Sequence, residues 1–279
     1  DYSAVKRTMV NGAEDAPPLM QALRWRLTKP GRRQRKMALA QYIQNDLLDR
    51  QVVDAVLSPH ASVDVREQAL RLVNLFASEP AGRTYLLGEL QLIDKLCTML
   101  TVNTGDADSV ARQNCLGALQ KLSLRRQPQN VMIDADVIAW LVTQLRDIDS
   151  LSQYSVEYGT ALLMNLSLRG AGKTKCTNPQ LDILTVLSQL MESDSMQVRT
   201  YVNGTLYSIL VRAPLKHRAD EIGLADSLRA LIEHSDETFA RQINYILEQI
   251  EKEAADEDEA MSDDEGGDEE EEEEAEEEM

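Results

Sequence analysis

Four stretches of the sequence resemble one another: RLVNLFA at 71–77, ALQKLSLR at 118–125, LLMNLSLR at 162–169 and GTLYSIL at 204–210. Aligned on Leu75, Leu122, Leu166 and Ile209, they recur at intervals of 47, 44 and 43 residues. Each follows a polar cluster that begins a helix, as at 64–66, 108–110 and 197–199. Each also precedes another apolar helix, expected over 85–100, 131–146, 180–192 and 222–233. A period in the forties with two or three helices per unit is typical of armadillo and HEAT repeats.

The composition also favours helices packed on helices. Aromatic residues make up only 4% of the chain, apolar residues recur at spacings of three and four, and no stretch alternates with period two. The small residues Gly117, Ala161 and Gly204 share one aligned position, where we expect neighbouring helices to approach closely. The sequence therefore predicts an all-α, armadillo/HEAT-type right-handed α-α superhelix of about five to six repeats.

Weaker repeats flank these four stretches, at 34–57 and at 239–250, as expected for terminal units with one face toward solvent. We therefore expect three regions. Residues 1–33 form a helical lead-in with a basic cluster, residues 34–250 form one repeat domain, and residues 251–279 form an acidic tail.

The charge of the chain is concentrated in that tail. The net charge is −18, yet residues 1–250 hold 28 acidic and 28 basic residues, and residues 251–279 hold 19 acidic residues and Lys252. A segment with so little to bury is predicted to stay disordered. It could solubilise the chain, fold back on a basic surface or bind a basic partner. Ser262, before three acidic residues, is a candidate site for an acid-directed kinase.

Three further features bear on location. Cys97, Cys115 and Cys176 fit neither a disulfide framework nor a zinc site, and the sequence shows no signal peptide and no apolar run near 18 residues. We therefore expect a reducing cytosolic setting, with neither secretion nor a membrane span. Because the sequence begins at Asp1 and not at a methionine, we expect a segment of a longer protein.

Motifs that resemble catalytic chemistry are weak. Gly172-Lys173-Thr174 resembles the end of a phosphate-binding loop, but Ser167 stands where that motif needs a glycine and no strand precedes it. An interhelical loop is the better interpretation. His60, His217 and His234 are widely separated and suggest no catalytic pairing. We predict no enzyme, no cofactor and no metal site.

The repeat register indicates a surface for binding a partner. The residue before each aligned position is Asn74, Lys121, Asn165 or Ser208, and in armadillo proteins an asparagine here commonly binds the backbone of an extended ligand. One turn later stand Ser78, Arg125, Arg169 and Arg212, with Arg126 beside them. The arginines could form a ladder along a groove. Equally, they could lie at helix C-termini, where cations interact favourably with the helix dipole.

A basic cluster lies near the N-terminus. It consists of Arg24, Arg26, Lys29, Arg32, Arg33, Arg35 and Lys36, with no acidic residue among them. It could bind nucleic acid, anionic lipid or an acidic protein tail, or it could be a solvated helix start around Pro30-Gly31. Nucleic acid is disfavoured because the acidic tail would repel phosphate.

The repeats resemble a specific family, that of LisH-domain armadillo-repeat-containing protein 9. The similarity is carried by CLGALQKLSLRR at 115–126, ALLMNLSLR at 161–169 and YVNGTLYSIL at 201–210. RLVNLFA at 71–77, GRTYL at 82–86 and the acidic stretch after the last repeat also fit it, so the similarity covers about residues 34–265. The glutamate run after Asp268 is longer than this family would lead us to expect.

This resemblance implies a non-catalytic scaffold at the basal body and ciliary tip, which supports ciliogenesis and axoneme length and stability. It implies partners among TOG-array or other microtubule-end proteins, and dimerisation through a LisH region that is absent from this sequence. A direct microtubule binder, with the basic surface masked by the acidic tail, is the main alternative. A generic peptide-binding adaptor is another. A nuclear-import carrier fits less well, because neither Trp25 nor Trp140 lies in the groove register.

Overall fold

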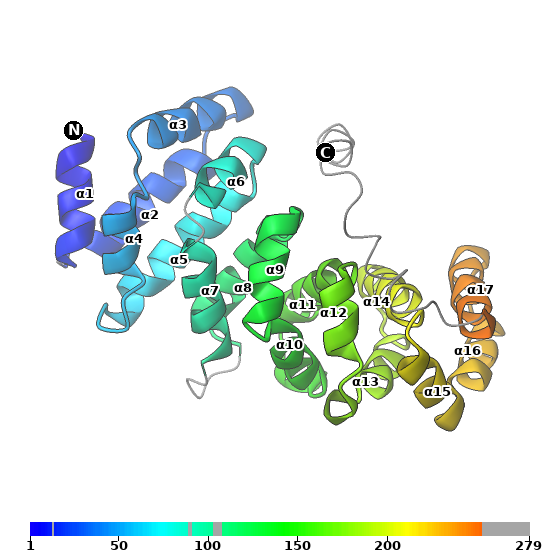
Figure 1. Cartoon of the computed structure of the whole chain (residues 1–279). Coiled ribbons are helices and arrows are strands. Elements are labelled where there is room, and N and C mark those ends of the chain that lie inside the picture. The colour runs from blue at the N-terminus through cyan, green and yellow to red at the C-terminus, as the bar shows by residue number, and fades with distance from the viewer. Residues whose placement is uncertain (13, 89–90, 103–107, 253–279) are drawn as a thin grey trace. The chain divides into compact units, whose positions relative to one another are not determined.

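A computed structural model describes residues 1–12, 14–88, 91–102 and 108–252. Within these residues every regular element is a helix: seventeen α-helices, with short 3-10 helices at Ile148–Ser150 and Pro179–Leu181 (Figure 1). The predicted all-α fold is therefore confirmed. The helices belong to two compact units, residues 1–122 and the residues from 123 onward.

The helices follow a repeating order of a first, a second and a third helix. The first helices are α3 (Arg32–Gln44), α6 (Pro80–Leu87), α9 (Arg126–Asp134), α12 (Gly170–Cys176) and α15 (Ala213–Glu221). The second helices are α4 (Arg50–Val56), α7 (Gln91–Thr101), α10 (Val137–Leu145), α13 (Ile183–Leu190) and α16 (Leu224–Ile232). The third helices are α5 (Val63–Ala77), α8 (Val110–Leu122), α11 (Gln153–Ser167), α14 (Met196–Ile209) and α17 (Glu237–Glu251). Helices α1 (Tyr2–Asn11) and α2 (Ala16–Thr28) precede these five repeats.

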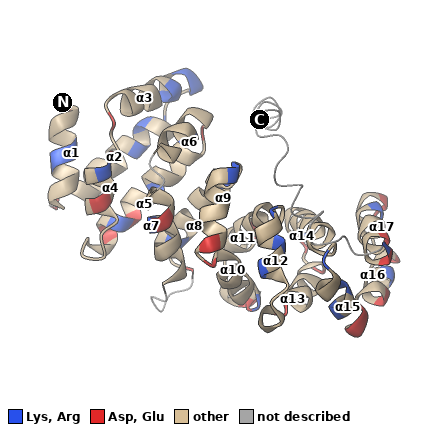
Figure 2. Ribbon diagram, in the orientation of Figure 1, with Lys and Arg blue, Asp and Glu red and all other residues tan. Residues whose placement is uncertain are grey.

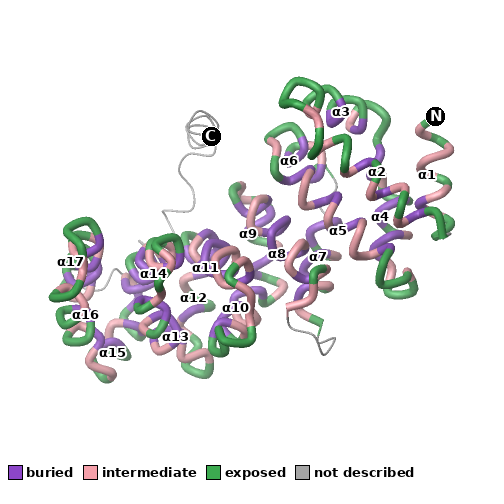
Figure 3. Tube along the Cα trace, turned by 180° about the vertical axis from the view of Figure 1, so that it is seen from behind, coloured by how far each residue is buried: buried purple, intermediate pink, exposed green. Residues whose placement is uncertain are grey.

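The third helices form the centre of each unit. In the first unit α5 packs against α8, and in the second unit α14 packs against both α11 and α17. The aligned residues Leu122, Leu166 and Ile209 are fully buried there, and burying a side chain of this size contributes about 1.5–3 kcal/mol. Gly204 permits close packing, because a Cβ at this position would lie 2.7 Å from the Sδ of Met164. Figure 3 shows buried segments recurring along these helices.

The expected lead-in is part of the repeat packing. The boundary expected between residues 33 and 34 lies inside α3, and α2 packs against α5 as a third helix would. The buried Tyr42 of α3 donates a 3.0 Å hydrogen bond to the carbonyl of Leu23, and its ring stacks on Phe76 with 6.1 Å between the centroids. These contacts tie α2, α3 and α5 into one core.

Serine caps begin several third helices, because a serine hydroxyl can accept a backbone N–H that has no partner within the helix. Ser62, Ser152 and Ser195 accept the N–H groups three residues on, at 3.2, 3.2 and 3.4 Å.

Two of the four single helices expected between the third helices, at 85–100 and 131–146, are in fact broken, whereas 180–192 and 222–233 each contain one α-helix, α13 or α16. Residues 85–100 include parts of α6 and α7, and 131–146 include parts of α9 and α10. At the second break Asp136 has a left-handed φ of 55°, a conformation that an α-helix cannot continue through. The spacing of apolar residues does not reveal a change of backbone direction at a single residue, so the sequence pattern could not predict this break.

Candidate partner-binding surface

In the first unit the predicted groove residues Asn74 and Lys121 lie together. The Lys121 ammonium donates to the Oδ1 of Asn74 at 2.6 Å and to the hydroxyl of Ser78 at 3.0 Å. The Asn74 amide nitrogen donates to the Oδ1 of Asn114 at 3.1 Å. These bonds join α5 to α8, and all of these residues except the exposed Ser78 are half-buried. This polar group holds two repeats together while part of it stays accessible.

Burial affects the charge of Lys121. Desolvation, with a smaller contribution from the nearby Arg83, lowers the pKa of the Lys121 ammonium to about 8. A cation in this position is less stable than one in water. A ligand oxygen that accepted a further hydrogen bond from the Lys121 ammonium would therefore stabilise its charged form.

In the second unit the predicted groove residues Asn165 and Ser208 point into the protein. The Asn165 amide nitrogen donates to the hydroxyl of Ser123 at 2.9 Å, and the Ser208 hydroxyl donates to the carbonyl of Ser167 at 2.7 Å. The two residues are only 6% and 8% exposed. Each bond reaches back to the end of the preceding repeat, so these side chains join repeats. Their role in binding a ligand stays a prediction.

Three arginines, Arg125, Arg169 and Arg212, occupy equivalent positions between a third helix and the next first helix. They are the N-cap residues of α9, α12 and α15, so they lie at the positive end of a first helix. Each also lies within three residues of the C-terminal end of a third helix, α8, α11 or α14, so two helix dipoles act on it in opposite directions and the explanation by a favourable helix C-terminus stays a prediction. Arg126 is the first residue of α9.

These three arginines differ in how far their side chains are buried. Arg212 is 6% exposed and donates to the Gly170 carbonyl at 3.1 Å and to the Thr174 hydroxyl at 3.3 Å. Arg125 and Arg169 are only half-buried. The structure therefore does not place the three guanidinium groups in one exposed ladder.

Exposed apolar side chains lie beside the polar register and were missed by the sequence argument. Leu124 lies two residues after the end of α8, and Leu168 directly follows α11. They are 47% and 48% exposed, and Tyr207 of α14 is 47% exposed. Leu124 and Leu168 neighbour Ser123 and Ser167, which accept the bonds described above. The signal was present in the Ser-Leu-Arg sequence that recurs at 123–125 and 167–169.

The basic cluster lies on the second half of α2 and the start of α3, where Figure 2 shows Lys and Arg gathered. Five of its members are exposed: Arg26, Lys29, Arg32, Arg33 and Lys36. Arg24 and Arg35 are half-buried. Burial, followed by repulsion from Arg71, lowers the pKa of Arg24, while Glu67 acts in the opposite direction.

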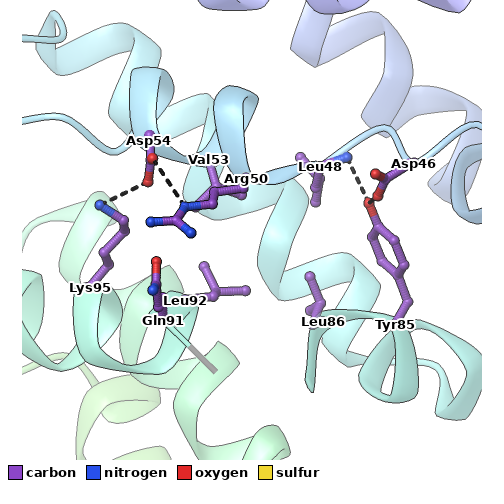
Figure 4. A pocket seen from close by; sticks show the side chains of 10 residues that line it. All are labelled: Asp46, Leu48, Arg50, Val53, Asp54, Tyr85, Leu86, Gln91, Leu92 and Lys95. Carbon is purple, nitrogen blue, oxygen red and sulfur yellow. Dashed lines mark hydrogen bonds and ion pairs between the residues drawn. The ribbon is translucent and has the colours of Figure 1, made fainter. Parts of the chain in front are cut away.

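A partly open pocket of the first unit is too small to hold a substrate. Figure 4 shows it between α4, α6 and α7, where Tyr85 accepts from the Leu48 N–H at 2.9 Å and donates to the Asp46 carboxylate at 2.7 Å. Lys95 pairs with Asp54 at 3.1 Å across it. Its volume is about 30 Å³, which is close to that of one water molecule.

The other motifs with a chemical appearance are explained by packing. Gly172, Lys173 and Thr174 lie inside α12, so the interhelical loop expected there is wrong. All three histidines are exposed. Burial raises the pKa of all three cysteine thiols, which keeps them protonated and poorly nucleophilic. The described residues contain no cluster of three potential metal ligands.

Two further results concern the limits of the described region. Within it, no helix combines the length and apolar character needed to cross a bilayer. Ser262 and nearly all of the predicted acidic tail, residues 253–279, lie outside the described residues.

Comparison with solved structures supports the armadillo architecture. Computationally designed armadillo repeat proteins for modular peptide recognition match 84% of this chain and 99% of theirs, with a TM-score of 0.61 and 18% identity. A designed armadillo repeat protein in complex with the peptide (KR)4 matches 85% of this chain and all of its own, with a TM-score of 0.59 and 17% identity. At such identities the likeness shows the fold alone, and it confirms the predicted armadillo class.

Sequence relatives are more specific. LisH domain-containing protein ARMC9 from Homo sapiens is 41% identical over 91% of this chain, and the match covers 31% of the human protein. The Danio rerio protein is 39% identical over 94% of this chain and 33% of its own length. The chain thus spans about a third of the length of these relatives. A model of the ARM repeats of LisH domain-containing protein ARMC9 matches residues 132–251. Together with the repeating helices, these matches show that the chain belongs to the LisH domain-containing protein ARMC9 family, in its armadillo-repeat region.

Proposed function

We propose that this chain is a non-catalytic scaffold that docks an extended or helical segment of a protein partner against the third helices of its repeats. One observation carries the proposal: equivalent residues recur one repeat apart on these helices, beside polar bonds that hold the repeats together. A surface built in this way presents the same kind of contact at regular intervals, which suits a linear ligand.

The chemistry of the surface favours an apolar ligand that also carries acidic residues. In the second unit Leu124 and Leu168 are exposed, and each precedes a half-buried arginine, Arg125 or Arg169. Designed armadillo proteins of the same fold are described as recognising peptides, and one of them holds the basic peptide (KR)4. Because the register here carries cations, we expect a ligand of opposite charge.

We further propose that the scaffold acts in the cytoskeleton at the basal body and ciliary tip, where it supports ciliogenesis and axoneme length and stability. Its partners would be TOG-array or other microtubule-end proteins. Membership of the ARMC9 family supports this proposal. The name of that family includes a LisH domain, and we propose that dimerisation depends on a region outside this sequence.

The test is the double charge reversal Arg125→Glu with Arg169→Glu in the full chain. Both residues are N-caps, and a carboxylate suits the positive end of a helix, so the variant should remain folded. Partners captured from ciliated cells should be lost at least tenfold in quantitative mass spectrometry, with an unchanged melting temperature. Equal capture by the wild type and the folded variant would exclude this docking surface.

A second candidate function is direct microtubule binding, and the five exposed cations of the basic cluster favour it. Acidic tubulin tails would meet these cations, and the acidic tail of this chain would mask them. The test is co-sedimentation of the full chain and of residues 1–252 with microtubules across a salt series. Helix α17 ends at Glu251, so this truncation keeps every described helix. Salt-sensitive pelleting of the shorter form alone would support masking, and pelleting of neither form would exclude direct binding.

A further inference from the structure

The basic cluster brings together seven cations that form no ion pairs with any residue that the structure describes. Several other exposed cations pair with carboxylates, as in Lys95–Asp54 at 3.1 Å, Lys175–Asp136 at 2.6 Å and Arg218–Asp182 at 3.1 Å. Within the described residues, none of the seven cations on α2 and α3 forms an ion pair. Their mutual repulsion is therefore uncompensated, and a polyanionic ligand would relieve it.

An open cavity lies within this cluster, between the end of α2 and the outer face of α3. Arg26, Pro30, Gln34 and Met37 line it together with Ala38 and Gln41, and its volume is about 230 Å³. Met37 is 55% exposed at this site. The nearby Trp25 is 43% exposed, with the Lys29 ammonium 3.7 Å above its ring centre. Such a volume accepts one large apolar side chain but no folded element.

One cation at the cavity is held in place before any ligand arrives. The Arg26 guanidinium donates to the Oε1 of Gln41 at 3.0 Å and to the hydroxyl of Tyr2 at 3.4 Å, and it lies 5.4 Å from the ring centre of Tyr42. The hydrogen bond to Tyr2, before any other interaction, raises the pKa of Arg26. On α3 a further donor is unsatisfied: the Nε of Arg35 is buried without a hydrogen-bond partner. A fixed cation loses less conformational entropy on binding.

From this geometry we propose a second binding site, on α2 and α3, for an acidic linear peptide that carries one bulky apolar side chain. The apolar side chain enters the cavity beside Met37, and flanking carboxylates meet Arg26, Lys29 and Arg33. Nucleic acid is a poorer fit, because a phosphate backbone makes no use of a cavity of this size. This proposal does not depend on the third-helix surface.

The experiment uses two fluorescent dodecapeptides made of Asp and Glu, one with a central Leu and its twin with a central Ser. Fluorescence anisotropy measures their binding to the full chain and to residues 1–252. We expect saturable binding of the Leu peptide, with the Ser twin about fivefold weaker because it leaves the cavity unfilled. Lys29→Glu with Arg33→Glu should weaken the Leu peptide at least tenfold, since each close charge pair contributes on the order of one decade.

A matched control separates the site from the overall charge. Arg229→Glu with Arg241→Glu makes the same charge change on the exposed surfaces of α16 and α17 and should leave the affinity within about twofold of the wild type. If residues 1–252 bind the Leu peptide and the full chain binds it more weakly, the result would support the site and show that the tail competes for it. Failure of both forms to bind, equal affinity for the two peptides, or equal losses in the two double variants would overturn the proposal. The proposal would also be overturned if single-stranded DNA or anionic vesicles bound more tightly than the Leu peptide and the Lys29→Glu/Arg33→Glu variant abolished that binding.

Discussion

Replacement of Gly172 by alanine should destabilise the second unit strongly. Gly172 is buried in α12, close to the end of α11. A Cβ at this position would overlap the carbonyl oxygen of Leu166 and would lie 2.9 Å from its carbonyl carbon and 3.4 Å from the Cδ1 of Ile133. Because the atoms of Leu166 belong to the backbone, no rotamer change can relieve the overlap.

The magnitude follows from that geometry. Overpacking a core by one methyl group costs about 1–3 kcal/mol, and a collision with backbone places Gly172→Ala at the upper end, about 3 kcal/mol. Each kcal/mol lowers the melting temperature of a domain of 150–250 residues by roughly 2–4 °C. The expected fall is therefore about 6–12 °C.

Circular dichroism at 222 nm during heating would measure this fall. Gly31→Ala is the matched control, because Gly31 has a negative φ of −64° and a Cβ there would meet nothing within 4 Å. It should leave the melting temperature within about 2 °C of the wild type, since surface substitutions cost at most about 0.5 kcal/mol. Equal melting temperatures for Gly172→Ala and the wild type would refute the packing role of this glycine and reopen the phosphate-loop interpretation.

Three further predictions concern the polar bonds between repeats. Arg212→Ala removes two hydrogen bonds of a buried cation and should lower the free energy of unfolding in urea by about 2–3 kcal/mol. Arg212→Lys should recover less than half of this loss, because an ammonium cannot span both acceptors. A loss below about 0.5 kcal/mol for Arg212→Ala would contradict this prediction. Asn165→Ala leaves the Ser123 hydroxyl without its donor and should cost about 1 kcal/mol, measured in the same way, and wild-type stability would show that the bond does not join the repeats. Burial lowers the pKa of Lys121 to about 8 from 10.5 in the unfolded chain, so between these values the unfolded state binds more protons and stability rises with pH. The free energy of unfolding of the wild type, relative to Lys121→Gln, should therefore increase from pH 7 to pH 9.5, and parallel pH profiles of the two proteins would contradict it.

Much of the fold could be predicted because periodicity reports burial directly. The aligned Leu122, Leu166 and Ile209 are buried, and the small residue at position 204 allows α11 and α14 to approach. Helix α2, in the expected lead-in, has no counterpart of the Leu-Ser-Leu sequence at 122–124 and 166–168. It nevertheless packs against α5 as a third helix.

The candidate surface was harder to predict, because the partner of a polar side chain depends on distances between repeats. Asn165 and Ser208 share the ligand-binding register of armadillo proteins, yet both bond to the end of the preceding repeat. Arg212 differs from Arg169 in burial although the two align. Composition did predict the basic cluster, but the sequence could not show the cavity within it.

Photo-crosslinking in ciliated cells tests the central claim most directly. A photoreactive amino acid replaces Leu168, at the end of a third helix, or Arg229, on the exposed surface of the second helix α16. The account predicts crosslinks to a protein partner from position 168 that disappear in the Arg125→Glu/Arg169→Glu background, with none from position 229. Crosslinks from position 229 alone, or crosslinks from position 168 that survive the charge reversal, would contradict docking on the third helices.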